Sequence, residues 1–190
     1  MKSIILGIIL FVISVSSFSQ PVPPPINLSI QNIQQQTQVW CWAAVAQQII
    51  LAKQGAANTP PQCALVAMAN GAHPSVCCSA YGNPGCVKTG SLQQIQYLIG
   101  QFGGAYSSIQ APANPMVLYN TLASGRPIIL QVKTGVMSAH VVVLTGMSFV
   151  PNGLGGVEPV LHINDPLSYF NQPVPFRNLI PIWMSAIVVG

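Results

Sequence analysis

Charged residues are scarce in this 190-residue chain: six lysines and arginines and two acidic residues together make up 4% of the sequence. So low a charge content excludes a highly charged disordered tail, a coiled coil and a polybasic nucleic-acid binder. The five basic residues beyond Lys2 are spread along the chain without forming a patch, so nucleic acid is not an expected partner. Glu158 and Asp165 are the only carboxylate side chains, which leaves at most one pair for carboxylate-based hydrolysis.

Long apolar runs are also rare, and the one that is present lies at the start of the chain. It covers residues 4–15, follows Lys2 and precedes Ser17-Phe18-Ser19, whose serines occupy the −3 and −1 positions of a cleavage site. Residues 1–19 are therefore predicted to be a signal peptide, and the mature protein is expected to be secreted or periplasmic. The run is too short to favour a stable membrane anchor. A Pro-rich segment over residues 20–34 and one domain over residues 35–190 would follow.

If the protein enters an oxidising compartment, its five cysteines can form disulfides. Cys63, Cys77, Cys78 and Cys86 are clustered, and Cys41 stands apart. The cluster predicts two disulfides, and because a bond between the adjacent Cys77 and Cys78 would be strained, two pairings remain: 63–77 with 78–86, or 63–78 with 77–86. A zinc site is the weaker interpretation, since the chain has no Cys-x2-Cys pair. Cys41 would then be either a buried spectator thiol or a thiol kept free because it reacts.

Apolar residues recur at helical spacing in the first part of the chain and give way to β-branched runs in the second. The pattern predicts four helices, over residues 41–55, 59–71, 91–104 and 114–125. Capping-box sequences mark the starts of the two middle helices, at Thr59 and Ser91. Strands are predicted over residues 127–132, 141–145, 160–163 and 187–189, and residues 77–90 are predicted to be loop. Helices followed by strands predict an α+β fold.

A cysteine in the first turn of a helix is suited to nucleophilic catalysis, because unpaired amide N–H groups and the helix dipole stabilise a thiolate there. Cys41 opens the first predicted helix. Such a nucleophile needs a base, and the base needs a group that orients it. His140 at the start of a strand and Asp165 at the end of another are the candidates, whereas His73 is expected in a solvated loop and His162 inside a strand.

The order of these residues resembles that of the papain-like cysteine peptidases. The resemblance is carried by Gln35, by Cys41-Trp42, by residues 140–146 (HVVVLTG) and by residues 163–167 (INDPL). The last two segments look like those of the bacteriocin-leader-processing peptidases and the secreted bacterial papain-like effector proteases. The resemblance implies a two-lobed fold with an N-terminal helical lobe, a C-terminal antiparallel β lobe and the active site between them.

The same resemblance implies a role for each matched residue. Cys41 would be the nucleophile, His140 the general base and then acid, and Asp165 the residue that orients the imidazole. Gln35 and the Cys41 backbone N–H would form the oxyanion hole. Alternatives are open at two positions. A one-residue shift would replace Gln35 by Gln34 or Gln36, and papain's use of Asn as its third residue makes Asn164 an alternative to Asp165. The sequence also departs from many relatives in having Val39-Trp40 before the nucleophile.

The sequence therefore predicts a secreted cysteine peptidase that acts on protein or peptide substrates without a cofactor. Its lobes would cover residues 41–104 and 126–190. One alternative is a papain-fold amidase, deamidase or transglutaminase, which would use the same Cys-His pair. The other is a non-catalytic secreted binding or toxin-like module whose thiol is idle.

Overall fold

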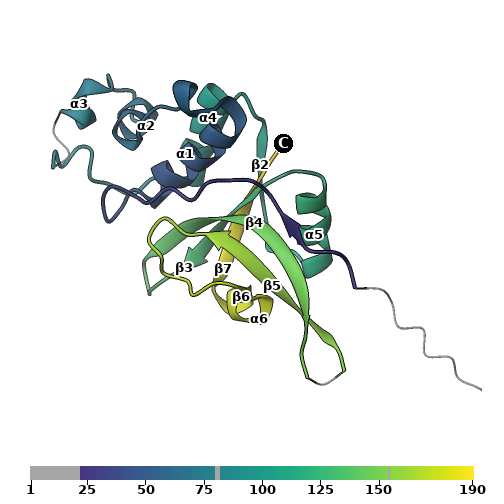
Figure 1. The fold of residues 1–190 in the computed structure, drawn as a ribbon. Helices are drawn as coiled ribbons and strands as arrows, with labels where there is room; N and C mark the ends of the chain where they lie inside the picture. The colour runs from purple at the N-terminus through teal and green to yellow at the C-terminus, as the bar shows by residue number, and fades with distance from the viewer. Residues whose placement is uncertain (1–21, 80–81, 154) are drawn as a thin grey trace, which may run out of the picture.

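The computed structural model describes residues 22–79, 82–153 and 155–190, so the predicted signal peptide lies outside the described residues. The described chain forms a helical lobe and a β-sheet lobe (Figure 1). The helical lobe contains α1 (Cys41–Gln54), the 3-10 helix η1 (Ala56–Asn58), α2 (Gln62–Ala69), α3 (Ser75–Cys78) and α4 (Leu92–Gly103). Within the described ranges, no helix is long and apolar enough to span a bilayer.

The start and end of α4 follow from local sequence signals. The Ser91 hydroxyl accepts the Gln94 backbone N–H, and the Gln94 side chain accepts the Ser91 N–H, which is the predicted capping box. Gly104 ends the helix in the left-handed conformation, where glycine carries no steric penalty. These contacts lie within a few residues of the helix ends, so the sequence predicts them well.

The start of α2 is where the sequence prediction was wrong. The residue that caps α2 is Pro61 rather than Thr59, and the Thr59 hydroxyl donates instead to the Gly55 carbonyl at 2.7 Å. Gln62, expected to complete a capping box, turns its side chain toward the N-terminal segment of the chain. The predicted loop over residues 77–90 also begins inside α3. A long-range contact made by Gln62 therefore replaces the local cap.

Seven strands of the described residues form one antiparallel sheet. Six of them follow the spatial order β2-β7-β3-β4-β5-β6, and β1 pairs with β4 beside this path. The strands are β1 (Ile26–Asn27), β2 (Ser107–Gln110), β3 (Ile128–Lys133), β4 (Ala139–Pro151), β5 (Val157–Asn164), β6 (Val174–Pro175) and β7 (Trp183–Val189). Helices α5 (Pro115–Ala123) and α6 (Phe176–Leu179) and the 3-10 helix η2 (Ile180–Ile182) complete the lobe. The α+β class and the antiparallel β lobe are as predicted.

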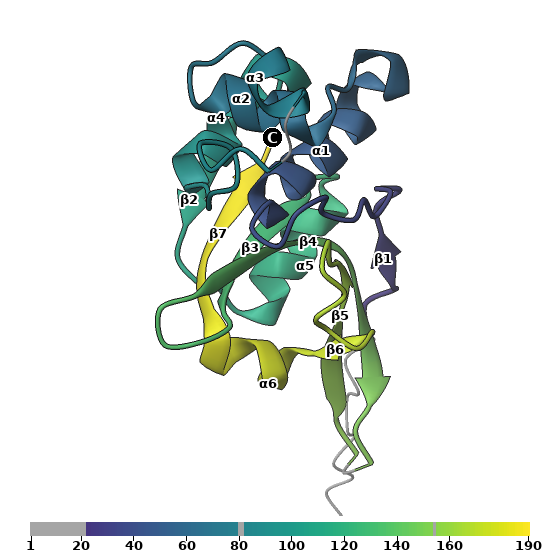
Figure 2. The ribbon, with the colours of Figure 1, turned by 90° about the vertical axis from the view of Figure 1, so that its left-hand side faces the viewer.

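Strand β4 is much longer than the predicted strand over residues 141–145, because it serves two partners. Its first half pairs with β3, and its second half pairs with β5 in a long hairpin that projects away from the helical lobe (Figure 2). The register shifts between Leu144 and Gly146, where β1 also pairs with β4. A Cβ at Gly146 would lie 2.5 Å from the Ile26 carbonyl oxygen, so only glycine allows this approach.

The sheet separates two apolar clusters. Along β3, Ile129 packs with the helical lobe, whereas Ile128, Leu130 and Val132 pack on the other face with α5 and the neighbourhood of α6. Because successive side chains of a strand point to opposite faces, a strand buried on both faces carries apolar residues at consecutive positions, as Ile128, Ile129 and Leu130 do. The helical lobe therefore rests on one face of the sheet, and the start of α1 lies where the two lobes meet.

The N-terminal segment from residue 22 to residue 40 connects the two lobes (Figure 2). The Tyr119 hydroxyl donates to the Pro24 carbonyl at 3.0 Å, and β1 then adds to β4. The chain continues without regular secondary structure toward the start of α1. The extended conformation expected of the Pro-rich part fits these contacts.

Candidate active site

Cys41 is the first residue of α1 and is partly buried. The residue before it, Trp40, is fully buried, and its indole N–H donates to the Cys86 carbonyl at 2.8 Å. The indole N–H of Trp42 donates to the Lys88 carbonyl at 3.2 Å. Two tryptophans thus fasten the start of α1 to the cysteine-rich loop. The sulfur lies beside the first helical turn, where backbone N–H groups lack helical partners.

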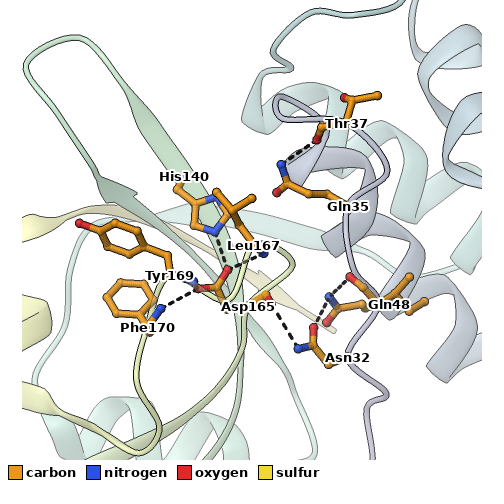
Figure 3. A network of polar contacts seen from close by, with 10 residues as sticks. Asn32, Gln35, Thr37, Gln48, His140, Asp165, Leu167, Tyr169 and Phe170 are labelled. Carbon is orange, nitrogen blue, oxygen red and sulfur yellow. Dashed lines mark hydrogen bonds and ion pairs between the residues drawn. The ribbon is translucent and has the colours of Figure 1, made fainter. Parts of the chain in front are cut away.

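His140 lies on β4, at the edge of the β lobe that faces α1. It pairs with Val132 on β3, and 5% of its surface is exposed. Its Nε2 lies 2.7 Å from Oδ1 of Asp165 (Figure 3). Since Asp165 binds Nε2, the other ring nitrogen, Nδ1, is the one that can exchange a proton with a second group.

Asp165 directly follows β5 and is 3% exposed. Besides His140, its carboxylate accepts three backbone N–H groups of the turn that follows, as Figure 3 shows. These come from Leu167 at 2.9 Å, Tyr169 at 2.6 Å and Phe170 at 2.9 Å. A carboxylate with this many donors is fixed in place and held in its ionised form.

The pair is electrostatically coupled. Burial alone would lower the pKa of His140, but hydrogen bonding to Asp165 and the neighbouring Cys41 sulfur outweigh it and raise the pKa to about 9. Burial alone would raise the pKa of Asp165, but hydrogen bonds from His140 and from the backbone N–H groups of Leu167 and Phe170 lower it below its usual value. At neutral pH the site therefore holds an imidazolium paired with a carboxylate.

Asn164 and Asp165 point in different directions, as expected for neighbours on an extended chain. The Asn164 amide donates to the Ile30 carbonyl at 2.8 Å, away from the imidazole. Of the two candidates that the sequence left open for the third position, the structure places Asp165 against His140.

Gln35 lies in the N-terminal segment and extends toward the side of the site where His140 lies (Figure 3). Its Nε2 donates to the Thr37 carbonyl at 2.7 Å, and its Oε1 is buried with no hydrogen-bond partner in the described part of the chain. The side chains of Gln34 and Gln36 are exposed. Gln35 is thus the member of the glutamine run with a buried carboxamide oxygen, and its amide nitrogen donates one of its two N–H groups to Thr37.

Buried glutamines of the helical lobe hold the segment that carries Gln35. Gln62 is 0% exposed; it donates to the Gln34 carbonyl at 2.8 Å and accepts the Gln36 N–H at 2.9 Å. Gln48 is also 0% exposed and donates to the Ile33 carbonyl at 3.2 Å. Sequence reasoning missed both roles, because Gln62 was expected in a local cap and Gln48 lies outside the predicted apolar face of its helix.

Two adjoining cavities flank the Cys41 sulfur. One has a volume of about 340 Å³ and is lined by Cys41 and His140 together with Gln38, Leu167 and Tyr169, among others. The other has a volume of about 300 Å³ and is lined on its apolar side by Trp42, Leu92, Ile95 and Val141. Cys41, Thr89, Ser138 and Ala139 line both cavities. The residue that begins α1, Cys41, therefore borders both cavities.

All five cysteines lie in the described part of the chain, and four of them form disulfides. Cys63 is bonded to Cys78 and Cys77 to Cys86, which is one of the two pairings that the sequence left open. The sulfur atoms that a zinc site would use are thus bonded to one another. Cys41 remains free.

The other two histidines lie outside the site. His73 is in the cysteine-rich region, where its Nδ1 contacts the Ser75 hydroxyl at 2.9 Å. His162 lies within β5, and its Nε2 contacts the Ser148 hydroxyl at 3.2 Å. Neither ring lines the cavities at Cys41.

Comparison with known proteins supports the fold that the sequence suggests. No family model matches the sequence, and no curated protein matches it. Among solved structures, a protein from Bacillus anthracis named as a candidate C39-like peptidase aligns with a TM-score of 0.50 and 12% identity, over 88% of this chain and 98% of that one. UfSP from C. elegans aligns with a TM-score of 0.49 and 10% identity, over 92% of this chain and 35% of that one. The chain has a papain-like cysteine peptidase fold.

Proposed function

We propose that this chain is a secreted cysteine peptidase in which Cys41 is the nucleophile, His140 the acid–base residue and Asp165 the residue that orients His140. The observation that carries the proposal is the buried His140–Asp165 pair, 2.7 Å apart, at a cavity that also contains the free thiol of Cys41. The peptidase fold adds support at the level of architecture.

The reaction would be acyl transfer through a thioester. In the imidazolium form of His140, the proton on Nδ1 is the one that the Cys41 thiol has given up, and the resulting thiolate attacks the peptide carbonyl. The developing oxyanion would be stabilised by the Cys41 backbone N–H and the free N–H of Gln35. His140 then gives its proton to the leaving amine, and a water activated by the neutral ring hydrolyses the thioester. Asp165 stabilises the imidazolium through these steps, because its hydrogen bonds keep it ionised.

Secretion is part of the proposal. Two disulfides within residues 63–86 are typical of proteins that fold in an oxidising compartment. The charged start, apolar run and small residues of the first 19 positions support the same conclusion.

Incubation of the purified protein with unlabelled casein and, separately, with peptidoglycan tests the proposed substrate class. Mass spectrometry of the products should show new peptide termini from casein, and Cys41→Ala should give none. Release of stem peptides from peptidoglycan with casein left intact would instead identify an amidase. Ammonia release or cross-linked casein without new termini would identify a deamidase or a transglutaminase.

A further inference from the structure

The proposed site draws residues from both lobes, so something must set the position of one lobe relative to the other. Residues 30–36, which we name the strap, run between them. Three hydrogen bonds in the described part of the chain join the strap to the end of β5 and the turn after it. Asn164 Nδ2 donates to the Ile30 carbonyl at 2.8 Å, Asn32 Nδ2 to the Asp165 carbonyl at 3.2 Å, and the Gln35 N–H to the Pro166 carbonyl at 3.0 Å.

The helical lobe holds the strap from the opposite side. Gln48 Nε2 donates to Asn32 Oδ1 at 3.2 Å and to the Ile33 carbonyl at 3.2 Å. Gln48 is seven residues after Cys41 on α1, which is two helical turns along the same side of the helix. A fully buried carboxamide is costly unless it is hydrogen-bonded. The nitrogen of this one donates twice to the strap, whereas its oxygen has no hydrogen-bond partner among the described residues.

Asn32 is the strap side chain that joins both sides (Figure 3). Its oxygen accepts from Gln48 and its nitrogen donates to the carbonyl of Asp165. The reverse orientation of the amide would place oxygen against oxygen and nitrogen against nitrogen, so the two partners fix the orientation. We propose that Asn32 is a positioning residue, which aligns the Cys41 helix with the His140–Asp165 pair by bonding Gln48 on one side and the Asp165 backbone on the other.

A change at Asn32 reaches the reacting atoms because each of its two neighbours, the turn at Asp165 and helix α1, is held together by its own hydrogen bonds. The Asp165 carboxylate binds three N–H groups of its own turn, so its backbone and carboxylate move together, and His140 follows through Nε2. On the other side, α1 links Gln48 to Cys41 through its helical hydrogen bonds. A small displacement of one part against the other changes the sulfur–imidazole geometry, to which proton transfer is sensitive.

The inference rests on the proposed function, but its test uses a readout that needs no substrate. The rate at which iodoacetamide alkylates Cys41 is measured from pH 5 to pH 9 in wild type, Asn32→Ala and Asn32→Gln. Asn32→Ala should lower the rate near pH 6 by about 3–10-fold and move the rise of the profile to higher pH, because the imidazolium stabilises the thiolate less when misaligned. Asn32→Gln retains the carboxamide on a longer stem and should recover part of the rate.

Asn58→Ala is the matched control. Asn58 is also an exposed asparagine whose amide donates to a backbone carbonyl, that of Gln54 at 3.2 Å, but it is remote from the site on η1. Its alkylation profile should equal that of wild type. An Asn32→Ala profile that coincides with wild type overturns the positioning role, as does an equal slowing in Asn58→Ala. Failure of the peptidase proposal looks different: casein stays intact while the alkylation profiles of wild type and Asn32→Ala still differ.

Discussion

At the scale of single residues, Asp165 combines a contact to His140 with three backbone N–H contacts, whereas its neighbour Asn164 bonds to the strap. Asp165→Ala should lower kcat/KM by about 10–10³-fold, because the imidazole loses both its orientation and the charge that stabilises it. Asp165→Asn should retain part of the activity, since an amide can still orient the ring. Asn164→Ala should be far milder.

Steady-state kinetics with a casein-derived peptide checks this order, with melting temperatures to confirm that each variant is folded. An inactive Asn164→Ala beside a fully active Asp165→Ala would reverse the assignment. Full activity in both variants would mean that catalysis requires only Cys41 and His140.

The pKa of His140 leads to a prediction about pH. Because that pKa is about 9 and the leaving amine must be protonated, kcat/KM should fall as the pH rises through about 9. The hydrogen bond and charge of Asp165 raise this pKa, so Asp165→Asn should move the fall to lower pH. Rates measured from pH 5 to pH 10, with circular dichroism at each pH, test this. A falling limb that stays in place in Asp165→Asn would show that Asp165 does not set the ionisation of His140.

Side-chain alternation on a strand is a local property, so reasoning from the sequence could show that only one of Asp165 and Asn164 faces His140, but it left open which one. It could not find Asn32, whose partners are Gln48 and the backbone of residue 165. Nothing local to Asn32 distinguishes it from other asparagines in extended segments. The contact exists only once the strap lies between the lobes.

At the scale of elements, the cysteine-rich loop supports the start of α1. The Cys86 carbonyl accepts the indole N–H of Trp40, the residue before the nucleophile, and Cys77–Cys86 holds that carbonyl in place. Replacing Cys77 and Cys86 by serine should reduce the free energy of unfolding by about 2–3 kcal/mol from loop entropy, and should also slow alkylation of Cys41.

The matched control replaces Cys63 and Cys78 by serine. This pair closes a loop of similar length, with a sequence separation of 15 against 9, so the loss of stability should be similar. Alkylation of Cys41 should change less, because Trp40 keeps its partner. Urea unfolding and the alkylation rate provide the two measurements. Equal slowing in both variants would mean that the effect on Cys41 reflects general loosening rather than the Trp40 contact.

Element boundaries were predictable where their causes are local. The capping box at Ser91 and the asparagine cap before Pro115 mark helices that the structure contains. The full length of β4 was not predictable, because its second half is defined by pairing with β5 and β1. Strands β1 and β6 are too short to show an alternating sequence pattern, and they are defined only by their pairing with β4 and β5.

At the scale of the whole molecule, the proposed chemistry depends on two lobes that contribute different parts. The helical lobe supplies Cys41 at the start of a helix. The β lobe supplies His140 on β4 and Asp165 directly after β5. The fold class followed from the order of helices and strands in the sequence. The way the lobes meet did not, because it depends on contacts between residues far apart in the chain, such as Asn32 and Asp165.

The reactivity of Cys41 in the folded protein is the most direct test of the central claim, that the two lobes together activate this thiol. Iodoacetamide should alkylate Cys41 at mildly acidic pH faster than it alkylates a model thiol, because the imidazolium and the helix start stabilise the thiolate. Cys41→Ala should abolish both labelling and hydrolysis while changing the free energy of unfolding by no more than about 1–2 kcal/mol. Peptide mapping by mass spectrometry locates the label. An alkylation rate for Cys41 equal to that of the model thiol at the same pH would contradict the account.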